Sequence, residues 1–197
     1  MKRTTRREAV LGLALAAALV PWATLRAEDA RPASTQPFTY EEYLAAKTPG
    51  SEHRALEALA GDLELTTTFW PASGAPPERS VMPARRTLGL EGRVLRLEVG
   101  PDPEGFRGSG MMGFDNVAGR HWYVWTDTTT TGVARVSGRL EADGTGFLEG
   151  TRPTPLGDTP FRIRITSEDD AEVHRYYEAS PSGKEVLFLE LRYRPVG

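Results

Sequence analysis

The sequence predicts an all-β domain, built as an antiparallel barrel of about ten strands with short plug helices at its N-terminal end. The 20 glycines and 15 prolines together make up about 18% of the 197 residues. In average proteins these two residue types together account for roughly 12%. This excess indicates many turns. From residue 63 onward, short runs with a period of two follow one another, and no helix-length pattern separates them. Strands without helical crossovers between them pair antiparallel.

Ten segments of strand length account for most of the chain after residue 63. In the clearest one, Phe161, Ile163 and Ile165 alternate with Arg162 and Arg164. The predicted strands are 63–70, 81–88, 93–99, 107–114, 121–127, 132–140, 146–151, 160–167, 171–179 and 185–194. Strands with one apolar face need closure or a second sheet to cover their edges. A closed up-and-down barrel is the simplest solution, and a β-sandwich is the alternative.

Two short helices are predicted ahead of the first strand. Thr39 and Glu42 have the spacing of a capping box, and the helix that they begin is expected to end near Lys47. Ser51 is the expected cap of a second helix, which Gly61 terminates.

Residues 1–27 are typical of an export signal. Four basic residues precede an apolar run over residues 10–20, which is too short to span a bilayer as a helix. The pair Arg6-Arg7 resembles the twin-arginine signal for export, and a general secretory signal is the alternative. With cleavage after Ala27, we expect a bacterial protein that is periplasmic or extracellular.

The rest of the chain divides into a polar linker over residues 28–37 and a single domain over residues 38–197. Cysteine is absent, which excludes disulfides, thiolate metal sites and a cysteine nucleophile. The formal charge of −3 becomes more negative once the signal is removed, so neither nucleic acid nor stable membrane association is expected. The three histidines, His53, His121 and His174, are too scattered for the usual zinc site, and no metal or cofactor is expected.

One strand offers a candidate ligand-binding surface. Within residues 121–127, the side chains of His121, Tyr123, Trp125 and Asp127 share one face. An aromatic wall with a titratable group at each end suits a ligand pocket. A histidine and a carboxylate on one strand face also suit acid–base chemistry. The alternative is a solvated outer face, or an aromatic core whose polar tips are satisfied.

Other polar residues have simpler interpretations. Asp115 and Asp127 lie where turns are expected, and a carboxylate there accepts hydrogen bonds from nearby amides. The pair Arg85-Arg86 is more typical of a solvated face than of an anion site.

Five motifs, in the same order, are shared with a known family. They are His53-x-x-Leu56-x-x-Leu59-Ala60-Gly61-Asp62, Gly92-Arg93-Val94-Leu95, Gly108-x-Gly110-x-x-Gly113-Phe114-Asp115-Asn116, Trp125-x-Asp127-x-x-x-Thr131-Gly132 and Tyr193-Arg194. On these motifs, the chain from residue 52 to about 195 resembles domain-of-unknown-function family 1579, found in bacteria. The resemblance implies a lipocalin-like antiparallel barrel and supplies no activity. Leu63, Glu91 and His121 stand where the family usually has Trp, Gly and Tyr, at positions expected to line the barrel.

Three functions fit these observations. The first is a carrier that holds a small apolar or amphipathic ligand in the barrel lumen, with Arg93 or Asp127 orienting its polar group. The candidate ligand-binding residues are Arg93, Asp115, His121, Tyr123, Trp125 and Asp127. The second is a structural or interaction module with a filled barrel. The third, less favoured, is a hydrolase or isomerase that uses His121 with Asp127 or Asp115. The volume of the lumen distinguishes the carrier from the filled module, because a carrier should have a lumen of at least several hundred cubic ångströms.

Overall fold

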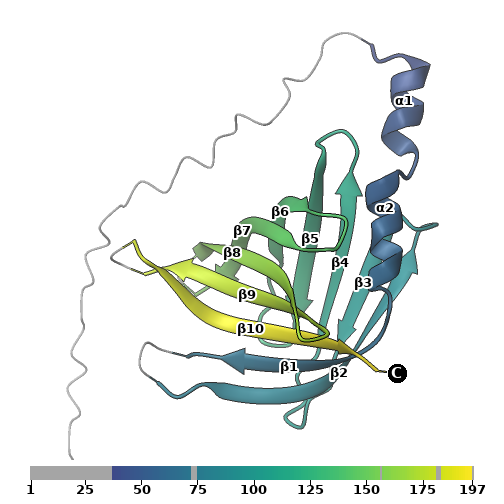
Figure 1. Ribbon diagram of the computed structural model, residues 1–197. Helices are drawn as coiled ribbons and strands as arrows, with labels where there is room; N and C mark the ends of the chain where they lie inside the picture. The colour runs from purple at the N-terminus through teal and green to yellow at the C-terminus, as the bar shows by residue number, and fades with distance from the viewer. Residues whose placement is uncertain (1–36, 72–74, 156, 181–182, 197) are drawn as a thin grey trace, which may run out of the picture.

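Ten antiparallel strands form a closed barrel (Figure 1), which confirms the predicted fold class. The structure is a computed structural model that describes residues 37–71, 75–155, 157–180 and 183–196. Each strand pairs with its sequence neighbours, and β1 pairs with β10 to close the barrel. The predicted export signal and the predicted linker up to residue 36 lie outside the described residues.

The strands begin and end within three residues of their predicted limits. They are β1 (Gly61–Phe69), β2 (Glu78–Gly89), β3 (Val94–Val99), β4 (Gly108–Asp115), β5 (Arg120–Asp127), β6 (Ala134–Leu140), β7 (Gly146–Thr154), β8 (Gly157–Glu168), β9 (Ala171–Ala179) and β10 (Glu185–Pro195). Between β8 and β9, Asp169 and Asp170 have φ of 48° and 62°. Two consecutive residues with positive φ give a turn whose twist matches that of a β-hairpin.

The alternating apolar side chains fill the barrel as two clusters. One contains Leu56, Leu95, Met112, Val136, Leu148, Phe161, Ile163 and Ile165. The other contains Leu63, Leu65, Met82, Ala84, Leu97, Val99 and Tyr193. Burial of one large apolar side chain stabilises the fold by roughly 1.5–3 kcal/mol. The interior face of the sheet therefore supplies most of the apolar burial, and the positions of polar residues on that face need a separate explanation.

Short helices precede the barrel: α1 (Tyr40–Lys47), α2 (Ser51–Ala55) and a 3₁₀ turn, η2 (Leu56–Leu59). The predicted capping box is present, since the Thr39 backbone N–H donates to the Glu42 carboxylate and the Glu42 N–H donates to the Thr39 hydroxyl. Figure 1 shows α1 projecting away from the barrel. Leu56 in η2 is only 1% exposed and packs into the first core cluster. The plug of the barrel is therefore η2.

The start of α2 differs from the prediction. Its N-cap is Gly50 and not Ser51, and the Gly50 N–H donates to Nδ1 of His53 at 3.1 Å. The buried imidazole of His53 takes the position that a Glu or Gln side chain has in a capping box. In the part of the chain that the structure describes, none of the helices has the length and apolar character needed to cross a membrane.

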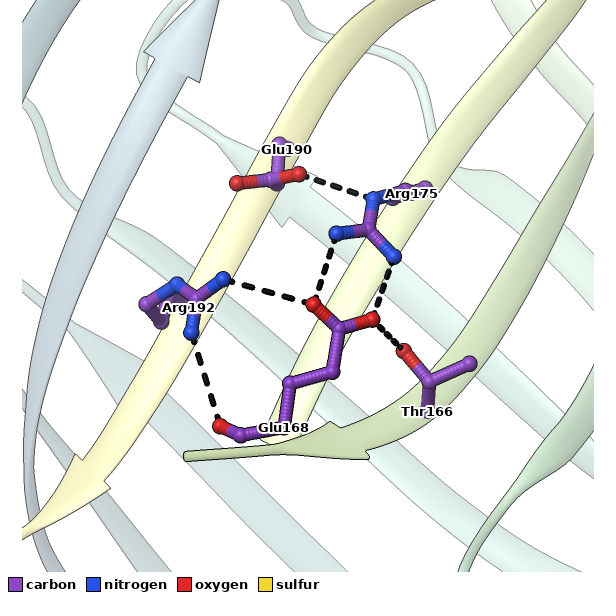
Figure 2. A network of polar contacts seen from close by, with 5 residues as sticks. All are labelled: Thr166, Glu168, Arg175, Glu190 and Arg192. Carbon is purple, nitrogen blue, oxygen red and sulfur yellow. Dashed lines mark hydrogen bonds and ion pairs between the residues drawn. The ribbon is translucent and has the colours of Figure 1, made fainter. Parts of the chain in front are cut away.

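The outer face of β8, β9 and β10 carries a network of charged residues (Figure 2). The Arg175 guanidinium donates to both carboxylate oxygens of Glu168, at 2.6 and 2.9 Å, and to Glu190 at 2.8 Å. Arg192 and Thr166 also reach Glu168. Val173 lies opposite Thr166 and Arg192 in the strand register, on this same face, and is 0% exposed. The network therefore covers an apolar residue on the outside of the barrel.

Candidate functional site

The four residues that the sequence places on one face of β5 point into the barrel. Tyr123 lies opposite Met112 and Val136 in the strand register, and both of these are core residues. Residues that are directly opposite in a sheet share a face. The inward face of β5 therefore carries His121, Tyr123, Trp125 and Asp127, although these residues do not converge on one point.

His121 lies at the plug end of the barrel. It is 4% exposed, its Nδ1 accepts the Leu140 N–H at 3.2 Å, and its ring meets the edge of Phe114. Burial lowers the pKa of His121; His53 adds to this effect, and Glu52 partly opposes it. Asp127, six residues along the strand, is roughly 20 Å away. Within the described residues, His121 forms no hydrogen bond with a carboxylate, and Glu52 acts on it only through its charge.

Trp125 and Asp127 form a unit at the far end of β5. The indole Nε1–H donates to Oδ2 of Asp127 at 2.8 Å, and the other carboxylate oxygen accepts the Thr129 N–H at 2.8 Å. The indole covers the backbone of β4, where a Cβ at Gly108 would come within 2.1 Å of it. This arrangement explains both the glycine in β4 and the carboxylate after the tryptophan as parts of the scaffold.

A buried polar cluster inside the barrel escaped the sequence analysis. The Arg86 guanidinium donates to both carboxylate oxygens of Glu172, at 2.7 Å each. The Arg86 guanidinium lies over the Tyr193 ring, 4.5 Å from its centroid, and Nε2 of His174 contacts the Glu172 carboxylate. Figure 1 shows that the strands that carry these residues, β2, β9 and β10, lie side by side with β1.

The prediction that Arg86 lies on a solvated face is wrong. Arg86 follows Met82 and Ala84 on the inner face of β2 and is 6% exposed. Its neighbour Arg85 faces outward and pairs with Asp62 at the surface. In this pair, alternation sends one arginine to the solvent and the other into the lumen.

The ion pair of the polar cluster stays charged although it is buried. Burial by itself would raise the pKa of Glu172, but Arg86 and His174 lower it to well below its ordinary value. For Arg86, burial works to lower the pKa, and Glu172 outweighs this effect and raises it. A buried pair with two short, parallel hydrogen bonds has the geometry that best offsets the loss of hydration.

A small cavity borders the polar cluster. Its volume is about 20 Å³, enough for about one water molecule. Its wall is formed by aliphatic and methionine side chains together with Arg86, Tyr123, Glu172 and His174. Leu59 of η2 and Gly144 of the β6–β7 turn also line it, so the cavity lies against the plug.

The Tyr123 hydroxyl is an unpaired polar group of a residue that lines this cavity. Among the residues that the structure describes, it has no hydrogen-bond partner. Burial raises the pKa of Tyr123 well above its ordinary value, and the nearby hydroxyls of Tyr176 and Tyr193 raise it further. The hydroxyl therefore stays protonated and can donate one hydrogen bond. Across the described ranges, no three His, Asp or Glu side chains come together as metal ligands.

Comparison with known families shows which family this chain belongs to. The model of a family described as "Protein of unknown function (DUF1579)" matches residues 48–195. The chain belongs to the DUF1579 family. A search among curated proteins found no match. The match confirms the resemblance drawn from the five motifs, and it covers the barrel and the plug that precedes it.

In this DUF1579 protein, two of the motifs hold the end of α1. The Asn116 amide donates to the carbonyls of Ala45, Ala46 and Thr48, at 3.0, 3.1 and 2.8 Å. Arg93 donates to the Lys47 carbonyl at 3.2 Å. These donors satisfy carbonyls that a helix leaves unpaired at its C-terminus.

Arg93 and Asp115, two of the candidate ligand-binding residues, thus lie at turns near α1. Arg93 also pairs with the exposed Glu91, and Asp115 accepts the Val117 and Ala118 amides at 2.8 and 3.0 Å. Neither is among the residues that line the cavity, whereas Tyr123 is. Their role in ligand binding stays a prediction.

Proposed function

We propose that this DUF1579 protein binds a small apolar or amphipathic molecule in the lumen of its barrel. The observation that carries the proposal is a buried ion pair and an unpaired hydroxyl at the wall of an otherwise apolar cavity. Ligand sites combine an apolar wall with a few fixed polar groups in this way. Arg86, Glu172 and Tyr123 would face the polar group of the ligand, in place of Arg93 and Asp127.

The volume of the cavity limits the ligand. Sites for drug-sized ligands usually measure roughly 300–1,000 Å³, and this cavity measures about 20 Å³. A ligand larger than a water molecule therefore has to displace side chains. Met112 and Leu59 both line the cavity, and the unbranched Met112 side chain adapts its shape at low cost. Leu59 belongs to the plug, so we infer that the ligand enters between η2 and the β6–β7 turn.

A filled barrel that serves as a structural or interaction module is the second candidate. The small cavity favours it, because the two clusters of buried side chains leave only about 20 Å³ at this place in the lumen. An experiment can distinguish the two candidates, because a binding protein takes up a ligand saturably and a filled barrel does not.

We further propose that the protein acts after export, in the periplasm or outside the cell. The basic residues before a short apolar run and the pair Arg6-Arg7 support this proposal. The mature protein is then acidic, and neither nucleic acid nor a membrane is its partner.

Native mass spectrometry of protein purified from the exported fraction tests the proposal. We expect a reproducible extra mass that is lost on denaturation, and a mature chain that begins at Glu28. If the chain is bare, titration with cyclohexanecarboxamide, followed through tryptophan fluorescence and NMR shifts of lumen residues, decides the question. A bare chain without saturable binding of this probe would transfer the assignment to the filled barrel.

A further inference from the structure

We propose that the lumen selects an uncharged polar ligand, such as an alcohol, ketone or amide, and rejects a carboxylate. This inference rests on the proposed function and adds the chemical class of the ligand. It follows from the way in which the charges inside the barrel are already paired.

The first reason is that the guanidinium of Arg86 already has a partner. Both terminal nitrogens of its guanidinium donate to Glu172, at 2.7 Å each, and its flat face lies against the Tyr193 ring. Two parallel bonds are also the strongest way in which a guanidinium holds an incoming carboxylate. Because Glu172 already has this place, a ligand carboxylate would have to displace it.

The second step is the charge that a ligand carboxylate would meet. Glu172 lines the cavity beside Arg86, and the two groups together carry no net charge. A ligand carboxylate that displaced Glu172 would leave a second carboxylate unpaired in a buried site, where an unpaired charge is costly. His174 contacts the same carboxylate through Nε2, and a His174→Gln variant isolates its contribution.

The third step is the hydroxyl that remains free. Tyr123 lines the same cavity, and within the described residues its hydroxyl has no hydrogen-bond partner. A neutral phenol donates one hydrogen bond to a carbonyl or accepts one from a hydroxyl. The free polar group of the cavity therefore suits a neutral ligand dipole, whereas the charged groups satisfy each other.

The experiment compares two probes of the same shape, cyclohexanecarboxamide and cyclohexanecarboxylate, at pH 7 and pH 8. Binding is followed by tryptophan fluorescence, because Trp125 lies beside Tyr123 with ring centroids 6.4 Å apart. We expect the carboxamide to bind at least about tenfold more tightly, because the carboxylate would lose its hydration in a site where Glu172 already holds the guanidinium. His174→Gln should retain this preference.

Three variants test the cause of the preference. Glu172→Gln removes the competing carboxylate and should reverse the preference toward cyclohexanecarboxylate. Tyr123→Phe should weaken binding of the carboxamide by about tenfold. Arg85→Gln removes a charge at the adjacent position on the outer face, where the side chain is 63% exposed, and should leave both affinities unchanged. Circular dichroism establishes that each variant is folded.

The outcomes separate this inference from the proposed function. If the wild-type protein binds cyclohexanecarboxylate as tightly as the carboxamide, or more tightly, the selectivity is overturned and lumen binding stands. If neither probe binds and the purified protein carries no extra mass, the proposed function fails and the selectivity fails with it. The measurement on the wild-type protein decides this even when Glu172→Gln does not fold.

Discussion

Replacement of Arg86 by methionine should strongly destabilise the barrel, because it leaves Glu172 buried without its partner. Two charge-assisted hydrogen bonds of 2.7 Å are lost, and each such bond contributes about 1.5–3 kcal/mol. Measured losses on breaking a buried ion pair are about 3–5 kcal/mol. For a domain of this size, 1 kcal/mol lowers Tm by roughly 2–4 °C, so Arg86→Met should lower Tm by roughly 6–20 °C.

The double variant Arg86→Met/Glu172→Leu should recover most of this loss. Apolar side chains of similar volume often replace a buried ion pair without cost, because both desolvation penalties disappear together. The assay is urea and thermal unfolding of the wild type, both single variants and the double variant, analysed as a double-mutant cycle. Arg85→Met is the matched control: its ion pair with Asp62 is exposed on both sides and contributes about 0–1 kcal/mol.

The refuting results are specific. If Arg86→Met costs less than about 1 kcal/mol, the ion pair is not desolvated as the structure shows. If the double variant is as unstable as Arg86→Met alone, the loss does not come from an unpaired Glu172 and the account of the interior charges is wrong.

Three further predictions concern separate parts of the molecule. The pKa of Glu172 is lower in the folded than in the unfolded chain, so its stabilisation is complete above pH 4.5, the ordinary pKa of glutamate, and is lost as the pH falls toward the folded pKa. Urea unfolding at several pH values should show this loss, which the double variant should lack. Gly110→Ala should cost about 1–3 kcal/mol by overpacking, since its Cβ would lie 2.6 Å from the Tyr123 hydroxyl; a well-folded variant with unchanged Tm would contradict this. Asn116→Ala should speed hydrogen exchange of the α1 amides with little change in the Tm of the barrel, because no residue of α1 is buried.

The fold was predictable because the two signals that define it are local. Period-two alternation sets which side chains enter the core, and Gly- or Asp-rich turns set where each strand ends. Asp169 and Asp170, for example, form the turn expected between β8 and β9. The capping box of α1 depends on residues only three positions apart. Neither feature needs knowledge of the rest of the chain.

The polar cluster was not predictable to the same degree, because it joins residues far apart in the sequence. Arg86 and Glu172 are 86 positions apart, and only closure of the barrel brings β2 near β9 and β10. A weaker signal existed in β2, where Arg86 continues the alternation of Met82 and Ala84. On β9 the alternation is harder to interpret, because Val173 is fully buried although it faces away from the lumen.

The predicted ligand face was partly informative for a related reason. Alternation places Tyr123 and Trp125 inward, but it does not say how far along the lumen each side chain lies. His121 and Asp127 are at opposite ends of β5 and use their polar atoms locally, on the Leu140 amide and on the turn at Thr129. A shared face of a strand therefore does not by itself establish a shared site.

The interior ion pair also bears on the choice between the two candidate functions. A barrel filled only for stability has a simpler solution, since well-packed apolar residues are often as stable as a buried ion pair, or more so. Here the pair and Tyr123 border the same cavity, and the Tyr123 hydroxyl has no hydrogen-bond partner among the described residues. Ligand sites use fixed polar groups of this kind to orient the molecule that they bind. The interior polar groups therefore support the proposed lumen binding, whereas the cavity volume of about 20 Å³ supports the filled barrel unless Met112 and Leu59 move aside.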